Sequence, residues 1–567
     1  MVSALIALSN EVLKTTQKRG SYMSKIMKKL GSLLLVVTMI VSMTACGSGG
    51  NSAVGDENSI TMRYALTEEL NSLDPNYNYS ATSMGMITNV NQGLMKYGTD
   101  GKITNGLAEK VDISEDGCTY TFTLRDAKWS NGDPVTSNDF YYSWRRLADP
   151  ANGCTYAYML ITAGVKNAMN VVYGGASLDE LGISCPDDKT FVVELDSPKS
   201  YFESLLCSGT YFMPVNQSYC EEQGDQFMKS KETSIYCGPY IMSDWEVGGT
   251  TYTLSKNPDY YDADNITVDK INYTLLTDEQ QKILSWENGD LDQVQLSGDY
   301  ITMYANDPAL TTLSWPGLFF IAFNCENELL SNRNLRLAIS MAIDKQQIVD
   351  KILCDGSTVA DFAVPAEFAK NSEGVTYREH AGNPVYNQYN VDSAKEYFES
   401  AKSELGKDTF EIELLYNEDS QLASVAAFIQ SQLQENLSGL TVKLRVTSYN
   451  QRLEDMGNGN YEMGITRWYA DYQDASTYLD MWTDDSSLNY ENWHNEEYNS
   501  LYEQVNGELA LDENARMDAQ AKMEKIFMDD AAICPLYQPA FQYLTNPNYN
   551  YVYTPEGSII TMYTTKK

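Results

Sequence analysis

Histidine is almost absent from this sequence, and cationic residues are few. The 567 residues include two histidines, His380 and His494. A histidine-rich metal site or a His-based catalytic triad is therefore not expected. Forty Lys and Arg stand against 78 Asp and Glu, which gives a formal net charge of −38. This excess of negative charge repels phosphate backbones, and we therefore expect no nucleic-acid partner.

The sequence motifs of common enzyme classes are also missing. There is no HExxH, no GxSxG, no P-loop and no GxGxxG. Asp112–Gly117 (DISEDG) imitates the start of a calcium loop, but Thr123 stands where that loop needs a bidentate glutamate. A hairpin turn before the next strand is the better interpretation. We therefore expect no catalytic residue, no metal and no cofactor, so that the protein is not an enzyme.

Long hydrophobic runs are lacking, apart from one near the N-terminus. Leu30–Met43 is apolar over 14 residues, whereas a membrane span needs about 20. Three lysines within Lys25–Lys29 precede the run, so residues 1–45 are predicted to be a signal peptide, with translation starting at Met23. The end of the run, Met43-Thr-Ala-Cys46, resembles a bacterial lipobox, in which Cys46 receives a lipid. The alternative is a plain secretory signal with a chance cysteine.

A Gly- and Ser-rich stretch follows this cysteine and shows no apolar periodicity. Residues 46–58 are therefore predicted to be a flexible tether. A lipidated cysteine, a tether and a soluble body together place the protein at the outer face of a cell membrane. Nine cysteines follow Cys46 without any CxxC spacing, and their odd number leaves at least one unpaired in a monomer.

The remaining chain has the composition of a globular protein. Hydrophobic residues make up 43% and charged residues 21%, and the length predicts roughly two to four domains. Alternating apolar residues predict strands, mostly in the first half. These predicted strands are Thr119–Leu124, Thr190–Asp196, Thr250–Ser255 and Lys270–Leu276.

The second half alternates between helical and strand periodicity. Asn334–Leu353 is predicted to be a helix that stops before Gly356. The strand Phe410–Tyr416, the helix Ser420–Leu437 and the strand Leu440–Val446 form a strand–helix–strand unit, which implies a parallel pair with a right-handed crossover.

The last predicted strand, Tyr461–Trp468, is followed directly by Asp471, which lies among Trp468, Tyr469 and Tyr472. In open α/β sheets, ligands bind outside the carboxyl ends of strands. Three roles for Asp471 are open at this point: an acid with a raised pKa, a grip for a cationic ligand, or a polar strand end.

Nine segments together resemble one family, the extracellular solute-binding proteins (family 5) of peptide ABC transporters, of the oligopeptide-binding lipoprotein type. They cover almost everything from about residue 58 to about residue 563. The segments are Ser72–Pro75, Gly106–Glu109, Ser114–Arg125, Trp129–Arg146, Cys237–Tyr240 with Trp245, Lys256–Tyr260, Glu287–Asp292, Asn334–Lys345 and Trp468–Asp474.

The resemblance implies an α/β protein with the periplasmic-binding-protein type II fold, in which two lobes, made of three structural domains, close on a ligand by a hinge. Residues 326–540 would form α/β lobe II. The implied parts of lobe I are a discontinuous body (59–105, 215–325 and 541–567) and a β-rich insertion domain (106–214).

The resemblance also implies which residues hold the ligand. A peptide would lie extended between the lobes and pair with protein backbone. Asp471 would take its α-ammonium, while Trp468, Tyr469 and Tyr472 would line adjoining pockets. Phe323 and Asn324, from a strand near the hinge, would also face the ligand.

One departure concerns the ligand's carboxylate. Relatives that bind short peptides by the C-terminal carboxylate use a basic residue where this chain has Ile465. Arg467 is expected to point to the opposite face from Ile465, which leaves ligand length open.

The implied function is that of a lipid-anchored, monomeric extracellular receptor, in a Gram-positive bacterium, that captures oligopeptides and delivers them to ABC permease subunits. The alternatives are a receptor of the same fold for an oligosaccharide or a signalling peptide and, third, an extracellular hydrolase.

Overall fold

The computed structural model describes residues 59–567, except for 79, 247 and 556. The predicted signal peptide, the start at Met23, the lipidated Cys46 and the tether all lie outside the described residues. Within the described part, no helix combines the length and the apolar character that a membrane span requires. Residues Ile60–Lys567 form one compact unit.

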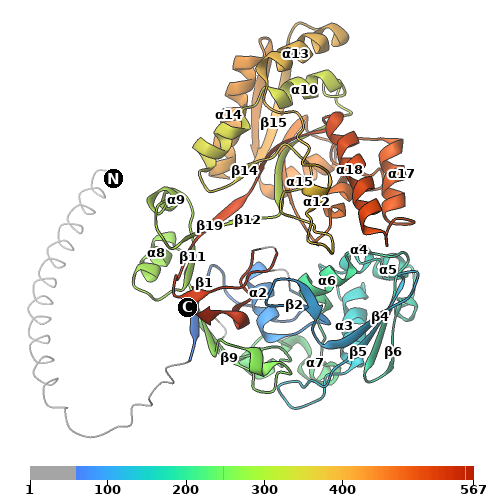
Figure 1. Ribbon diagram of the computed structural model, residues 1–567, viewed down its shortest axis with the longest axis vertical. Helices are drawn as coiled ribbons and strands as arrows, with labels where there is room; N and C mark the ends of the chain where they lie inside the picture. The colour runs from blue at the N-terminus through green and yellow to red at the C-terminus, as the bar shows by residue number, and fades with distance from the viewer. Residues whose placement is uncertain (1–58, 79, 247, 556) are drawn as a thin grey trace, which may run out of the picture. The chain divides into compact units, whose positions relative to one another are not determined.

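A seven-stranded sheet gathers segments from both ends of the chain (Figure 1), in the order β12-β19-β11-β1-β10-β9-β8. β1 pairs in parallel with β10 and β11, and the other neighbours are antiparallel. The strands are β1 (Thr61–Leu66), β8 (Tyr240–Trp245), β9 (Thr251–Lys256), β10 (Lys270–Leu275), β11 (Gln293–Gln295), β12 (Leu310–Ser314) and β19 (Ala540–Thr545). The predicted strands near residues 250 and 270 are confirmed as β9 and β10.

A four-stranded antiparallel sheet lies entirely within the predicted insertion segment. Its order is β4 (Ala108–Ile113), β5 (Thr119–Leu124), β7 (Thr190–Glu194) and β6 (Ile183–Asp187). Alternation in β5 buries every second side chain, as predicted. The hairpin turn between β4 and β5 is also confirmed: Gly117 has a φ of 68°, and its N–H donates to the carbonyl of Ser114 at 2.9 Å.

A six-stranded sheet is built mostly from residues of the predicted lobe II, in the order β14-β18-β13-β17-β15-β16. Its strands are β13 (Gly317–Phe323), β14 (Thr358–Val359), β15 (Phe410–Asn417), β16 (Leu440–Thr447), β17 (Met463–Tyr469) and β18 (Ile533–Gln538). β15 and β16 are parallel and are joined through α14 (Ser420–Asn436), so the predicted strand–helix–strand unit is confirmed. β13 precedes the expected boundary at residue 326 and nevertheless pairs with β17 and β18 inside this sheet.

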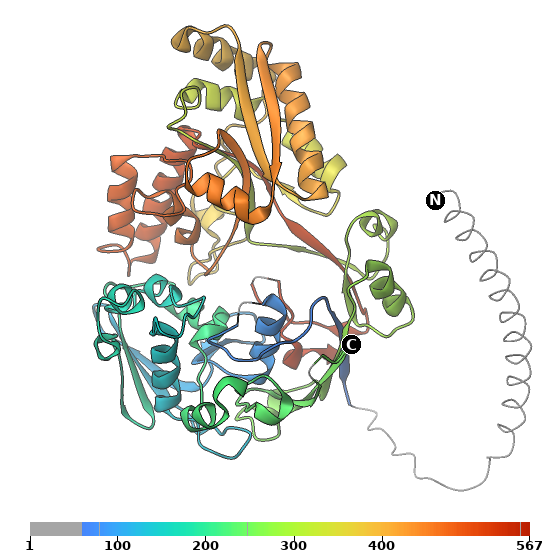
Figure 2. The same ribbon diagram turned by 180° about the vertical axis from the view of Figure 1, so that it is seen from behind.

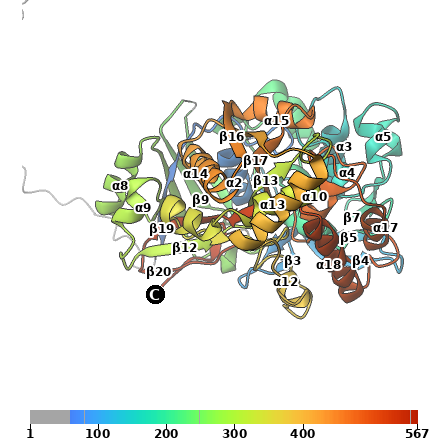
Figure 3. The same cartoon turned by 90° about the horizontal axis from the view of Figure 1, so that it is seen from above.

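Helices cover both faces of the six-stranded sheet (Figure 1 and Figure 2). Core residues of α13 and α14 pack on one face, and core residues of α17 and α18 pack on the other. Seen from above in Figure 3, α10 lies beside α13. The longer helices are α2 (Ala81–Val90), α3 (Ser137–Ala148), α8 (Glu279–Glu287), α10 (Arg333–Met341), α13 (Val391–Leu405), α14, α15 (Tyr449–Gly457), α17 (Glu496–Val505) and α18 (Glu513–Asp529).

The prediction of a single helix over Asn334–Leu353 is wrong in one respect, because the helix is interrupted. α10 ends at Met341, and Asp344 then caps a new turn by accepting from the N–H of Gln347 at 3.3 Å. An aspartate favours a helix N-cap over a helix interior, so apolar spacing alone missed the break.

Candidate functional site

The end of β17 presents an open backbone edge. β13 pairs with β17 along all seven of its residues, whereas β15 pairs with it only at Met463 and Gly464. Among the described strands, none pairs with the other edge of β17 from Ile465 to Tyr469. Unpaired N–H and C=O groups of this kind can accept an added strand.

The alternation of the backbone shows which groups face this edge. The guanidinium of Arg452 donates to the carbonyl of Ile465 at 3.2 Å, so that carbonyl points away from β13. Backbone groups in a strand repeat with a period of two residues. The N–H and C=O groups of Arg467 and Tyr469 therefore point the same way, and these four groups are free to pair with an extended ligand.

Asp471 follows the open edge directly. Its N–H donates to the hydroxyl of Thr477 at 3.1 Å, which fixes the backbone, while its side chain is exposed. Among the described residues, no hydrogen-bond donor or cation binds its carboxylate. The surrounding protein nevertheless displaces enough water to raise the pKa of Asp471 to about 6. The carboxylate is thus accessible, densely surrounded and unpaired.

Three tyrosines of the predicted insertion domain lie near this carboxylate. Burial raises the pKa of Tyr156 and Tyr158, and the nearby negative charge of Asp471 raises both further. Tyr156 stacks on Tyr211 with ring centroids 5.2 Å apart, and the pKa of Tyr211 is also raised by burial and by Asp471. A cation bound at Asp471 would therefore have these tyrosines among its neighbours. Sequence reasoning missed these tyrosines, because nothing in the pattern separates them from the other 38 of the 41 in the chain.

Trp468 and Tyr469 lie beside the open edge. Trp468 packs against the core that contains α17 and α18, and its indole N–H is buried without a hydrogen-bond partner among the described residues. The ring of Tyr469 lies on the other face of the strand, edge-on to Phe319 with centroids 6.4 Å apart. Both aromatics are half-buried, as pocket walls would be.

Tyr472, Phe323 and Asn324 occupy interior positions. Tyr472 stacks on Tyr201 with centroids 3.9 Å apart, so it connects the predicted lobe II with the predicted insertion domain. Its hydroxyl donates to Asp480 at 2.9 Å, and burial raises the pKa of Asp480 to about 7. Phe323 is fully buried in the core, and Asn324 is 7% exposed and donates its amide to two backbone carbonyls of the chain before β17. A ligand contact for these three residues stays a prediction.

The expected opposition of Ile465 and Arg467 is wrong. Ile465 belongs to the core cluster against which Phe319 packs, and the guanidinium of Arg467 lies 5.8 Å from the ring centroid of Phe319. Residues two apart in a strand face the same side. Arg467 therefore occupies the same face as Ile465 and lies two residues nearer to Asp471.

The second aspartate of the motif, Asp474, is structural. It is 7% exposed, forms an ion pair with Arg516 and accepts from the amide of Gln520 at 2.9 Å. Burial lowers the pKa of Arg516 to about 10, as expected for a cation withdrawn from water.

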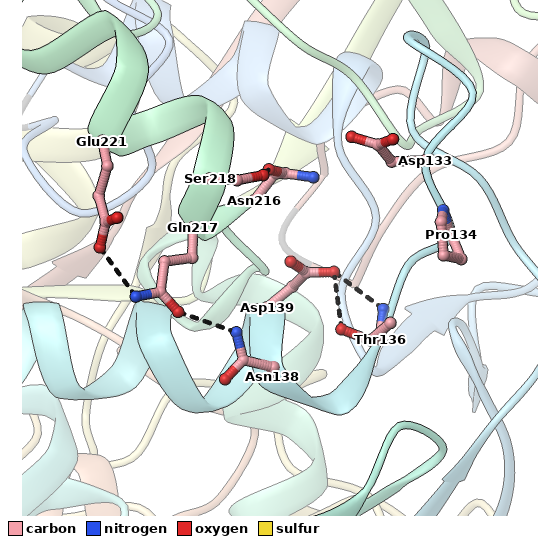
Figure 4. Close-up of a pocket in the computed structure, with 9 residues that line it drawn as sticks. All are labelled: Asp133, Pro134, Thr136, Asn138, Asp139, Asn216, Gln217, Ser218 and Glu221. Carbon is pink, nitrogen blue, oxygen red and sulfur yellow. Dashed lines mark hydrogen bonds between the residues drawn. The ribbon is translucent and has the colours of Figure 1, made fainter.

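A separate hollow of about 390 Å³ lies between α3 and the short helix α7 (Gln217–Gln223). Figure 4 shows its polar walls, in which Gln217 bridges Asn138 and Glu221. The carboxylate of Asp139 is occupied by the N–H and hydroxyl of Thr136 and by the indole of Trp129. None of these residues belongs to the β17 edge, and the polar groups already satisfy one another.

Comparison with known proteins places the chain in a family. The model described as bacterial extracellular solute-binding proteins, family 5, middle region, matches residues 102–490. The chain belongs to this family. Its members bind solutes and are not enzymes, so the expected absence of catalysis agrees with the family, and the expected type II periplasmic-binding fold is confirmed.

Relatives match over nearly the whole chain. The oligopeptide-binding protein OppA of Bacillus subtilis is 31% identical over 525 residues, which cover 89% of this chain and 93% of that protein. A dipeptide-binding protein of Lactococcus lactis is 29% identical over 536 residues, covering 92% and 95%. The solved structure of Listeria monocytogenes OppA bound to peptide has a TM-score of 0.70 at 31% identity, over 90% of this chain and 99% of that one.

Proposed function

We propose that this protein captures oligopeptides outside the cell and delivers them to an ABC importer. The observation that carries the proposal is the open edge of β17, which ends in the accessible, unpaired carboxylate of Asp471. An edge strand followed by a carboxylate matches an extended peptide with a free α-ammonium. The peptide-binding relatives support the same ligand class.

Binding would combine two interactions of different specificity. Backbone pairing with Arg467 and Tyr469 does not depend on ligand side chains, so it allows many sequences. The charge-assisted contact of the ammonium with Asp471 fixes one end of the peptide and sets its register. Trp468 and Tyr469, which lie on opposite faces of the strand, would then contact alternate ligand side chains.

We also propose that the mature protein is a monomer anchored to the outer face of a Gram-positive cell membrane through lipid on Cys46. The support is the apolar run followed by Thr44, Ala45 and Cys46. Mass measurement of the mature protein tests this: a diacylglyceryl adduct on an N-terminal Cys46 is expected. Cys46→Ala should release the protein from the membrane fraction, and an unmodified Cys46 in the mature protein would exclude the anchor.

Incubation of purified protein with a mixed peptide and glycan pool tests the ligand class. Bound material is isolated by gel filtration, released by acid and identified by mass spectrometry. Intact peptides are the expected result. Retention of glycans alone would replace the proposal by a receptor for another ligand, and recovery of cleaved peptides would indicate a hydrolase.

A further inference from the structure

Most arginines in the described part of the chain are paired with a carboxylate. Eight of the eleven described arginines form such an ion pair, as expected for a chain with 78 acidic residues. The paired arginines are Arg63, Arg145, Arg146, Arg333, Arg336, Arg378, Arg445 and Arg516. In the described part of the chain, Arg125, Arg452 and Arg467 have no such partner, and two of these three are neighbours at the edge of β17.

Arg467 and Arg452 share one aromatic ring. The guanidinium carbons of Arg467 and Arg452 lie 5.3 Å and 5.2 Å from the ring centroid of Tyr449. Arg467 also lies 6.0 Å from the ring centroid of Tyr469. Aromatic faces stabilise guanidinium groups but neutralise no charge. Two positive charges are therefore held together without a counter-ion among the described residues.

Arg452 is the more unusual of the two. It is 1% exposed, it donates to the carbonyl of Ile465 and to the sulfur of Met456, and its Nε has no partner. Burial and the positive charge of Arg467 lower its pKa, in that order of size. A buried cation without a carboxylate costs several kcal/mol. That cost is offset when a ligand brings the missing negative charge.

Two carboxylates of the same region, Asp355 and Asp419, are engaged elsewhere. Asp355 and Asp419 raise the pKa of Tyr537, which burial raises most and which Arg467 lowers, so they lie in the same region. Asp355 accepts from the N–H of Ser357 at 2.9 Å, and Asp419 caps α14. Neither comes within 4.0 Å of a nitrogen of Arg467, since no such ion pair occurs among the described residues.

We propose that Arg467, supported by Arg452, is a carboxylate subsite of the peptide groove. This inference rests on the proposed function. The backbone of Arg467 faces the open edge, so a paired ligand residue would lie beside its side chain. Asp471 is four residues further along, or about 13 Å at about 3.3 Å per residue. The carboxylate therefore belongs to the third or fourth ligand residue, either as the C-terminus of a short peptide or as an Asp or Glu side chain.

Isothermal titration with matched peptides tests the subsite on the unaltered protein. The set contains alanine-based peptides of three to six residues, each as the free acid and as the C-terminal amide, and amidated hexapeptides with Gln or Glu at position three or four. A C-terminal subsite predicts that the free acid of three or four residues binds at least tenfold more tightly than its amide. A side-chain subsite predicts the same preference for Glu over Gln. Equal affinities within all these pairs would overturn the proposal.

Two arginine variants test which residue produces the preference for peptides with a carboxylate. Arg467→Gln should lower affinity for the preferred carboxylate peptide at least tenfold and remove the acid-over-amide or Glu-over-Gln preference. Arg125→Gln is the matched control, because Arg125, in the predicted insertion domain, is also without a carboxylate partner and lies 4.3 Å from the ring centroid of Tyr261. It should leave both affinity and preference unchanged. A preference that survives Arg467→Gln would assign the carboxylate to another residue.

Arg452→Gln tests the supporting role. Arg452 is buried and donates to the carbonyl of Ile465, so we assign it as a positioning residue that acts through Arg467. Its variant should reduce the carboxylate preference without changing affinity for the amidated peptides. Failure of the subsite and failure of the proposed function are distinguishable. Equal affinities within all acid–amide and Glu–Gln pairs overturn only the subsite, whereas a protein that binds no peptide at all overturns the function.

Discussion

Two aspartates of the same motif, Asp471 and Asp474, are three residues apart and have opposite environments. Asp474 is buried and saturated by Arg516, Gln520 and the N–H of Ser476. Asp471 is exposed, and no side chain of the described residues binds its carboxylate. Asp474 therefore stabilises the fold, whereas the carboxylate of Asp471 remains available to bind a ligand.

This difference indicates that the binding edge is distinguished by charged side chains that lack a partner of opposite charge, and not by charged side chains in general. Arg516 and Arg378 have buried carboxylate partners, whereas Arg467 and Arg452 have none among the described residues. The unpaired groups of both signs lie along one strand edge, with the negative group at its end and the positive groups upstream. A zwitterionic, extended ligand carries the complementary charges in the same order.

The largest expected effect is on stability and concerns the saturated aspartate. Asp474→Ala leaves Arg516 as an uncompensated buried cation, which typically costs about 3–5 kcal/mol. Urea unfolding followed by tryptophan fluorescence measures this loss. Asp471→Ala is the control and should leave the free energy of unfolding within about 0.5 kcal/mol or raise it. Equal destabilisation by both substitutions would remove the distinction between the two aspartates.

The next effect is on binding and concerns the available aspartate. Asp471→Asn keeps the shape of the side chain but removes the charge that would face the ligand ammonium. We expect peptide affinity to fall about a hundredfold, or about 2.7 kcal/mol, in isothermal titration. Peptides acetylated at the N-terminus are the control, because they should bind the variant and the wild type equally weakly. An unchanged affinity for free-amine peptides would place the ammonium elsewhere.

A pH profile separates the two aspartates further. Binding of an ammonium requires the ionised form of Asp471, whose pKa in the ligand-free protein is about 6. Affinity should therefore be highest near pH 7 and fall by up to tenfold per pH unit below about pH 6, as protonation of Asp471 competes with the ligand. It should also fall above about pH 8, where the α-amino group of the peptide loses its proton. In Asp471→Asn the fall below about pH 6 should be absent. A wild-type profile that is flat between pH 7 and pH 5 would contradict the assignment.

Local sequence patterns predicted much of the architecture. The alternation in β5, the strand–helix–strand unit around α14 and the position of Asp471 after a strand were all readable, because each depends on neighbours in sequence. The broken helix at Asp344 was missed because a cap competes with apolar periodicity. The tyrosines that approach Asp471 were missed because they come from residues about 300 positions earlier, and no local pattern encodes that contact.

The charge state of the site could not be read from the sequence either. Arg467 was visible, but its pairing depends on which acids the fold brings near it. Only the structure shows that Asp355 and Asp419 are engaged with backbone N–H groups and that Arg452 lies behind the same tyrosine ring. Because the fold leaves Arg467 without a carboxylate partner among the described residues, Arg467 becomes a candidate ligand contact.

The smallest expected effect concerns Tyr472, the aromatic residue between the two aspartates. Its ring stacks on Tyr201 of the insertion domain with centroids 3.9 Å apart, and such pairs contribute about 0.5–1.5 kcal/mol beyond burial. Tyr201→Leu should therefore weaken peptide binding by roughly two- to tenfold, because it loosens a contact that holds the lobes together around the ligand. Tyr549→Leu is the control, since its ring contacts Tyr551 within a single lobe. If both substitutions leave affinity unchanged, the contact between Tyr201 and Tyr472 does not contribute to closure, and Asp471 and the β17 edge must retain the ligand without it.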